Sequence, residues 1–340
     1  MSMRSNADTK AHTLTDQLLS GATTPSIDDY LKLLNPLRQH LGLQWSNIRS
    51  YHNLPRHLHP VFRFSNFDTS TYSGYYELLY PALQLATAIL TETAQLGFWH
   101  GMVYRQRWDS TQASPGSKPV PFAMFDATPD ATLQENKMTL SFIERMAHQL
   151  KFQPSVDLQG GDGECQAVDE TGRAVGQKAK VCHGNVISFN AAYIDEAKSH
   201  IESGDDYAAA LFYFRAATTF LHEFAHAAHN TVFGPHTHVF FGDEAAAEVG
   251  FAYENYLFGG IPCWTEDQFY LRNWPCPYWQ DTYEAGKRRF GLRKAITNNN
   301  RLWLVLSDGI QAMYTADFWR NVAEEVYPFM LWTLDEIATA

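Results

Sequence analysis

The chain has 340 residues, of which 45% are hydrophobic and 14% aromatic, and its formal net charge at pH 7 is -11. This length and composition suffice for a large buried core, in one domain or in two fused lobes. The negative charge argues against nucleic acid as a partner, because phosphate binding requires clustered lysine and arginine side chains.

The N-terminal segment is polar, and no apolar segment of the kind found in secretory signals follows it. The most apolar early stretch, residues 81–90, is far shorter than the roughly 20 residues that cross a bilayer. Four cysteines without a CxxC pair are too few for a disulfide framework in a chain of this length. We therefore expect a soluble, cytoplasmic protein with free thiols and no membrane partner. The sequence indicates no oligomeric state.

The first 120 residues are predicted to be mostly helical after an unstructured start. Residues 1–25 are polar and rich in Thr, Ser and Asp, which is typical of a disordered lead. Residues 26–120 then form a helical N-terminal region, with helices expected at 26–41 and 75–96. The segment 110–121, rich in Ser, Pro and Gly, is predicted to be a loop.

Residues 121–340 combine helical and strand patterns. Apolar side chains at helical spacing predict a helix over 133–152. A turn cluster rich in glycine follows, and residues 165–168 and 174–181 are predicted to flank a hairpin. The run Asn185–Asn190 is β-branched and aromatic, which favours a strand.

Two further helices are expected after this strand. The first runs from Asp206 to Asn230, before the stop signal Gly234-Pro235, and the second covers residues 243–257. The aromatic-rich C-terminal part is predicted to add helices at 283–294 and 318–337. Together these elements predict a fold of the α+β class that is mainly helical.

The first of these two helices carries the motif His222-Glu223-Phe224-Ala225-His226. Residues four apart lie on one helix face, so His222 and His226 can both present an imidazole nitrogen to one zinc ion. Glu223 is rotated away from that direction and can act as the catalytic base that activates a zinc-bound water. The other interpretation is an ordinary helix with two partly buried histidines. The apolar surroundings argue against it, because two imidazoles and a carboxylate are costly to bury unless something binds them.

A zinc site of this kind requires a third protein ligand from outside the first helix. Glu244 and Glu248 lie four apart in the second predicted helix, so both can face the first. One could bind zinc while the other holds a ligating histidine, or both could lie on a solvated helix face. His229 follows His222 by seven residues, about 10 Å along the helix axis, and is too far away to bind the same ion.

Other side chains are weaker candidates. The sequence does not identify the group that would stabilise the transition state, for which the candidates are Tyr253, Tyr256, His236 and His238. Three histidines near the N-terminus, His52, His57 and His59, surround Pro55 and Pro60. We interpret this segment as a loop without a defined metal geometry.

The segment that begins at His222 resembles the zincin metallopeptidases, specifically the gluzincin type, in which a second helix carries a glutamate ligand. Glu248-Val-Gly-Phe resembles a pattern of fungal metallopeptidase-like proteins, which implies Glu248 as the third ligand. In thermolysin-like enzymes the first acid of such a pair binds the metal, which would imply Glu244. Glu248 is favoured because its pattern, which continues to Glu254, matches over more positions.

This resemblance covers residues 185–260 and implies a zincin-like catalytic region within 121–340, with a small sheet and an active-site helix. It also implies that Asn185–Asn190 is the strand along whose edge a peptide substrate pairs. The function that it implies is a zinc-dependent, metallopeptidase-like hydrolase with Zn2+ as its cofactor and Glu223 as its base.

Two other functions fit the same motif. A zinc enzyme that acts on a small molecule, such as a hydrolase, lyase or cyclase of secondary metabolism, could use the abundant aromatic residues for an apolar pocket. A non-catalytic, zinc-stabilised binding module would not require Glu223, so the presence of this glutamate argues against that function.

Overall fold

The structure is a computed structural model. It describes residues 54, 57–72, 74–92, 95–111, 120–158, 161–175, 182–204, 206–242, 244, 247–264, 269–272 and 302–304. Several predictions lie outside the described residues: the disordered lead at 1–25, the helix at 26–41, His52, most of the loop at 110–121, and the helices at 283–294 and 318–337.

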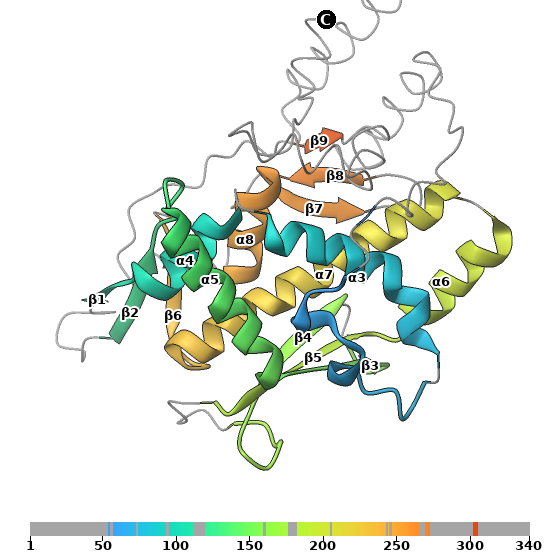
Figure 1. Cartoon of the computed structure of the whole chain (residues 1–340), viewed down its shortest axis with the longest axis horizontal. Coiled ribbons are helices and arrows are strands. Elements are labelled where there is room, and N and C mark those ends of the chain that lie inside the picture. Colours follow the sequence, from blue (N-terminus) through green and yellow to red (C-terminus); the bar gives the residue numbers. More distant parts are fainter. Residues whose placement is uncertain are drawn as a thin grey trace, which may run out of the picture.

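The described residues form an α+β fold, which confirms the predicted class (Figure 1). The α-helices are α3 (Tyr75–Thr91), α4 (Leu96–Tyr104), α5 (Leu133–Met146), α6 (Ala192–Ser203), α7 (Asp206–Phe233) and α8 (Val249–Phe258). Short 3-10 helices are η2 (Pro60–Phe62), η3 (Phe64–Asn66) and η5 (Ala147–Gln149). The strands are β1 (Arg107–Thr111), β2 (Val120–Phe125), β3 (Leu150–Ser155), β4 (Gly163–Val168), β5 (Gly184–Asn190), β6 (His238–Phe241), β7 (Ile261–Trp264), β8 (Phe269–Arg272) and β9 (Leu302–Leu304).

The strands make three small sheets, in the orders β1-β2-β6, β3-β5-β4 and β7-β8-β9. In the second sheet β5 is the central strand, parallel to β3 and antiparallel to β4. The predicted strand Asn185–Asn190 is confirmed as part of β5. The prediction that a substrate pairs along its edge is wrong, because both of its edges are already paired. Of these three strands, β3 and β4 are the ones at the edges of the sheet.

Helix α7 is the longest described helix and crosses the centre of the fold (Figure 1). It packs against α3, α6 and α8 and against strands β4 and β5. Phe214, Phe220 and Phe224 on this helix are fully buried, and burial of each stabilises the fold by roughly 1.5–3 kcal/mol. The helix ends at Phe233 because Gly234 adopts a φ of 84°, a left-handed conformation that glycine tolerates.

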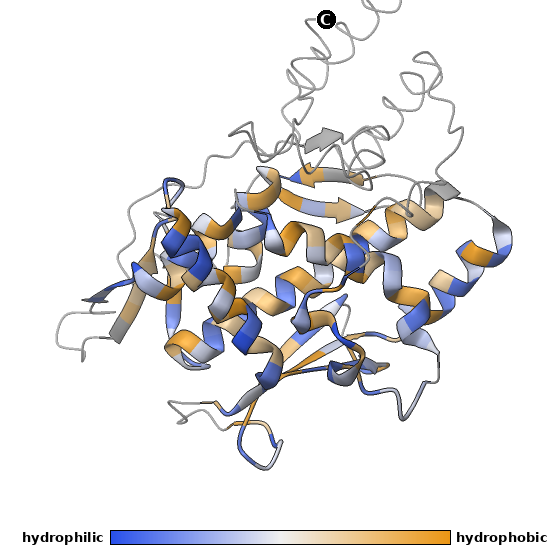
Figure 2. Ribbon diagram, in the orientation of Figure 1, coloured by the Kyte–Doolittle hydropathy of each residue, from blue (hydrophilic) through white to orange (hydrophobic). Residues whose placement is uncertain are grey.

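Aromatic contacts fix the second sheet against α7. The ring of Phe220 meets the rings of Phe189 on β5 and Phe152 on β3 edge-to-face, with centroids 5.5 and 5.8 Å apart. The hydropathy of the ribbon agrees with this core: α3 and α7 are largely hydrophobic, whereas α5 carries many hydrophilic residues (Figure 2). None of the described helices combines the length and the apolarity that crossing a membrane requires.

Two predicted helices are shorter than expected. Helix α5 ends at Met146, and Leu150–Ser155 is strand β3 instead of the end of a helix. Leu150 and Phe152 are buried and Lys151 is exposed, which is the alternation of a strand, and pairing with β5 decides the conformation. The helix predicted at 75–96 is divided as well, because α3 ends at Thr91 and α4 begins at Leu96.

The second predicted helix also begins later than expected. Helix α8 starts at Val249, and Glu248 is its N-cap, with an extended backbone at φ -128° and ψ 94°. The prediction that Glu244 and Glu248 face the first helix from one helical surface is therefore wrong. Glu248 caps the helix because its carboxylate accepts a hydrogen bond from the backbone N–H of Phe251.

The predicted hairpin is confirmed in part. Strand β4 ends at Val168, which makes a bridge with Ala174 across a turn. The carboxylate of Asp169 accepts backbone hydrogen bonds from Thr171 and Arg173 and so fixes this turn. Residues 176–181 of the expected second strand lie outside the described residues.

Candidate metal centre

Helix α7 places both histidines of the motif on one face. The ring centroids of His222 and His226 are 5.1 Å apart, as expected for residues separated by one helical turn. The side chain of His222 is 14% exposed and that of His226 31% exposed. The predicted helix and its spacing are confirmed, and two imidazoles are available to one ligand.

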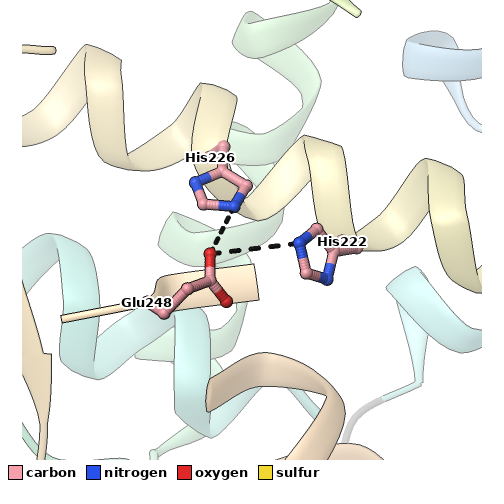
Figure 3. A group of neighbouring side chains, drawn as sticks. All are labelled: His222, His226 and Glu248. Carbon is pink, nitrogen blue, oxygen red and sulfur yellow. Dashed lines mark ion pairs between the residues drawn. The ribbon is translucent and has the colours of Figure 1, made fainter. Parts of the chain in front are cut away.

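Glu248 joins the two histidines from the residue before α8 (Figure 3). Its Oε1 atom lies 2.6 Å from Nε2 of His226 and 3.9 Å from Nε2 of His222. One potential ligand atom from each of the three side chains lies within 4.8 Å of the others. These three residues could therefore hold a metal ion, and the geometry favours Glu248 as the third ligand.

The N-terminus of α8 orients the carboxylate of Glu248. Its Oε2 atom accepts a hydrogen bond of 2.6 Å from the backbone N–H of Phe251, while Oε1 points to the histidines. The backbone amides at a helix N-terminus also favour negative charge. One oxygen is therefore fixed by the helix, and the other is directed at the imidazoles of His222 and His226.

Glu254 is a residue of the site to which the sequence assigned no role. Its Oε1 atom lies 2.8 Å from Nδ1 of His222, and the residue is only 6% exposed. Such a carboxylate holds the imidazole with the proton on Nδ1, so that the lone pair on Nε2 is directed at the metal-binding position. A carboxylate within the mostly apolar helix 249–258 was the sequence signal that could have identified it.

The charges of the site fit a divalent cation. The carboxylates of Glu223, Glu248 and Glu254 lie around His222, and each of them lowers the cost of positive charge on its ring. Burial of several carboxylates beside two imidazoles is unfavourable without a compensating charge. Two imidazoles and one carboxylate are also the ligand set of many hydrolytic zinc sites.

The pKa shifts describe a site that attracts positive charge. Burial by itself would lower the pKa of His222, but the charges of Glu254 and Glu248 outweigh it and raise that pKa to about 10. For Glu248, burial acts to raise the pKa, and the charges of His226 and His222 nevertheless lower it to about 2. Burial raises the pKa of Glu223, which brings this carboxylate closer to the range of a base at neutral pH.

Glu223 lies against the edge strand β4. A Cβ atom added to Gly163 would lie 2.8 Å from Cγ and 3.0 Å from Oε1 of Glu223. It would also lie 2.9 Å from Cγ2 of Thr219, one helical turn earlier. Only glycine allows the strand backbone to approach the predicted base this closely.

A second glycine, Gly250, makes room for the imidazole of His222. A Cβ atom added to Gly250, in the first turn of α8, would overlap the imidazole of His222, at 2.5 Å from both Cδ2 and Cε1. This contact gives a physical reason for the glycine in the segment Glu248-Val-Gly-Phe. The ring of Phe251 packs against His222 from the same turn, with centroids 4.8 Å apart.

The two weaker metal candidates lie elsewhere. Glu244 precedes α8, and its Oε1 atom is 3.5 Å from Nδ2 of Asn255; it is not part of the group formed by His222, His226 and Glu248. His229 has its Nε2 atom 2.9 Å from the backbone oxygen of Thr237, and burial lowers its pKa. This contact connects the end of α7 to the following turn.

The remaining predicted residues are spread over the fold. Tyr253 is fully buried in the core, with its ring 4.4 Å from that of Trp99, and Tyr256 packs against Phe98 and Phe241. His238 lies in β6, opposite Phe122 of β2, and His236 is exposed in the preceding turn. In the early cluster His57 is exposed, whereas His59 is buried and accepts a hydrogen bond from the backbone N–H of Val61.

Comparison of the chain with models of known protein families, with curated proteins and with solved structures finds no match. The arrangement of the described residues is therefore the basis for any function assigned to this site.

Proposed function

We propose that this chain is a zinc-dependent hydrolase of the metallopeptidase type. The observation that carries the proposal is the convergence of His222, His226 and Glu248, with Glu223 next to the first histidine and buried beside the same group. A site that only bound a structural metal would need four protein ligands. Among the described residues three are in place, which leaves a position for water and substrate.

Zinc is the proposed metal because of the donor set. Imidazole nitrogens suit zinc better than calcium or magnesium, which prefer oxygen ligands. Two histidines and one glutamate form a three-ligand set that is typical of zinc in peptide hydrolysis. When bound, zinc would lower the pKa of a coordinated water towards about 7 and polarise the carbonyl group under attack.

The residues of the chain then have distinct roles. Glu223 would take the proton from the attacking water and transfer it to the leaving group, and its burial, which raises its pKa, suits that role. Glu254 would keep His222 in the orientation and tautomer that bind metal. Glu248 would provide a ligand oxygen that the N-terminus of α8 fixes.

The edge strand β4 supports a peptide as the substrate. It pairs with β5 on one side, and its first residue, Gly163, lies against Glu223. The bridge between Val168 and Ala174 occupies the end of the other edge. An extended peptide can add to that edge closer to Gly163 by backbone hydrogen bonds, which would bring its scissile bond near the base. Strand β4 therefore takes the role that the sequence assigned to Asn185–Asn190.

A peptide library tests this proposal. Purified protein loaded with one equivalent of Zn2+ is incubated with a mixture of unstructured peptides, and the cleavage products are identified by mass spectrometry. We expect cleavage that is lost on removal of zinc and in Glu223→Ala, which should still bind one zinc. A library left intact by the zinc-loaded protein would contradict the peptidase function, and hydrolysis of small esters or amides alone would favour a small-molecule substrate.

A further inference from the structure

One face of α7 carries a row of polar side chains that leads to the predicted base. Arg215, Thr219 and Glu223 follow one another at intervals of four residues, so they lie along one side of the helix. Arg215 is about 12 Å from Glu223 along the axis, at 1.5 Å per residue. The start of β4 lies against the same side, because Gly163 contacts both Thr219 and Glu223.

Arg215 holds the residue that precedes β4. Its Nε atom donates to Oδ2 of Asp162 at 3.0 Å, and its Nη2 atom donates to Oδ1 of the same carboxylate. Two parallel hydrogen bonds fix both the distance and the orientation of an arginine–carboxylate pair. Because Asp162 is joined directly to Gly163, this pair determines where the strand begins.

The guanidinium group is itself held from two other directions. Its Cζ atom lies 5.3 Å above the ring of Tyr193, and its Nη1 atom lies 3.8 Å from Oε2 of Glu196. Tyr193 is buried, and its hydroxyl is 3.0 Å from Oγ1 of Thr219, the next residue in the row. The guanidinium group of Arg215 is therefore held against α6, which carries Tyr193 and Glu196, as well as against Asp162.

The backbone around Asp162 completes the connection. The carbonyl oxygen of Asp162 accepts a hydrogen bond of 3.0 Å from the N–H of Asn190, at the end of β5. Gly163 then pairs with Phe189 as the first residue of β4. The side chain of Asp162 is thus held by α7 and its backbone by the sheet, one residue before the contact with Glu223.

We propose that Arg215 is a positioning residue for hydrolysis: its ion pair with Asp162 holds the edge strand β4 against Glu223 and so fixes one wall of the substrate site. This inference rests on the proposed function, since it concerns the strand along which the substrate would bind. Partly exposed ion pairs contribute little to global stability, and both of these side chains are about one-third exposed. A displacement of about 1 Å at a catalytic site, in contrast, can cost about 100-fold in rate.

Hydrogen exchange tests whether the ion pair holds the strand. Arg215→Met keeps an unbranched, partly apolar side chain and removes the guanidinium group with its charge, and Asp162→Asn removes the other charge with little change in shape. Arg107→Met is the matched control, because Arg107 forms an exposed ion pair of 2.7 Å with Asp126 and lies on β1, in a different sheet from β4. In full-length zinc-loaded protein, we expect the amides of β4 to exchange at least tenfold faster in both site variants and at the wild-type rate in the control. Unchanged exchange in β4 overturns the proposal.

Kinetics with the best peptide from the library separate positioning from stability. We expect Arg215→Met to bind one Zn2+ with wild-type affinity and to lose about tenfold to 100-fold in kcat/KM, with the double variant Arg215→Met/Asp162→Asn no worse than either single variant. Wild-type kcat/KM in Arg215→Met, or an equal loss in Arg107→Met, overturns the proposal. If the wild-type protein cleaves no peptide, the proposed function fails, and hydrogen exchange alone decides whether Arg215 holds β4.

Discussion

Oε1 of Glu254 lies 2.8 Å from Nδ1 of His222, and this contact connects α8 to the face of α7 that carries His222 and His226. Both side chains are largely buried, at 14% exposure for His222 and 8% for Glu254. A buried carboxylate in this position fixes which imidazole nitrogen is available to a metal.

Removal of this contact should weaken metal binding without removing a ligand. We expect Glu254→Gln to lower the affinity for Zn2+ by about 10-fold to 100-fold, the usual effect of losing such an orienting carboxylate. Glu244→Gln is the control, because Glu244 lies outside the metal group. Competition with a chromophoric chelator measures both affinities, and equal values for the two variants would mean that Glu254 does not orient His222.

Metal binding should release a proton even in mildly alkaline solution. The pKa of His222 without metal is raised to about 10, mainly by Glu254 and Glu248 against the opposing effect of burial. A ligating imidazole must be neutral, so zinc has to displace this proton at any pH below about 10. Affinity should therefore rise with pH through this range.

Calorimetry at pH 8 in buffers of different ionisation enthalpy counts the protons released. We expect about one proton from His222 for each zinc ion bound, in addition to the proton that a zinc-coordinated water with a pKa near 7 releases at this pH. Imidazoles with the ordinary pKa of about 6.5 would be almost entirely neutral at pH 8 and would add almost none. Release of no more than the proton of the coordinated water would contradict the effect of Glu254 and Glu248 on His222.

Gly163→Ala should disturb the base and spare the metal ligands. The added Cβ would lie 2.8 Å from Cγ of Glu223 and 2.9 Å from Cγ2 of Thr219, so either the strand or the glutamate must move. We expect kcat to fall at least tenfold, with zinc affinity within about twofold of the wild type.

Gly161→Ala is the matched control two residues earlier in the chain. Its added Cβ would meet one backbone oxygen at 3.4 Å, an ordinary contact. The two variants are compared by kcat on the same peptide and by zinc titration. Similar kcat values would show that the approach of β4 to Glu223 does not matter for turnover.

His59 should make the fold sensitive to acid. The pKa of His59 is lowered from 6.5 to about 4, mainly because the side chain is buried and to a smaller extent because Arg63 carries a positive charge. Below pH 6.5 the unfolded chain therefore binds a proton at this residue that the folded chain does not bind until about pH 4. The stability contributed by neutral His59 is present above pH 6.5 and is lost as the pH falls to about 4, by on the order of 3 kcal/mol.

Urea unfolding at pH 7 and pH 4.5 measures this loss. His59→Gln has no titrating group and should show a smaller decrease in the free energy of unfolding than the wild type. His57→Gln serves as the control, because His57 is exposed. If His59→Gln and the wild type lose the same stability, His59 is not the group responsible.

Local sequence predicted the centre of the site because its geometry is local. His222 and His226 lie four apart within one helix, and helix geometry alone places both imidazoles on one face. Glu248 was predicted from its sequence pattern. The prediction that it lies within a helix was wrong, because Glu248 is the N-cap of α8 and its carboxylate accepts a hydrogen bond from the backbone N–H of Phe251.

The parts that the sequence did not predict depend on distant contacts. Glu254 acquires its role only when α8 packs against α7; its place in a mostly apolar segment sets it apart, but that pattern does not name His222 as its partner. The edge position of β4 depends on the order of the strands in the sheet, which the strand pattern at Asn185–Asn190 does not contain. Leu150 and Phe152 fit both a helix and a strand, and pairing with β5 decides between them.

Anomalous diffraction at the zinc edge, on crystals of the zinc-loaded protein, tests the metal centre most directly. One peak is expected about 2.0–2.2 Å from Nε2 of His222, Nε2 of His226 and a carboxylate oxygen of Glu248, with a fourth position open to solvent. A peak bound by other residues, or no peak between these three side chains, would contradict a metal centre on α7.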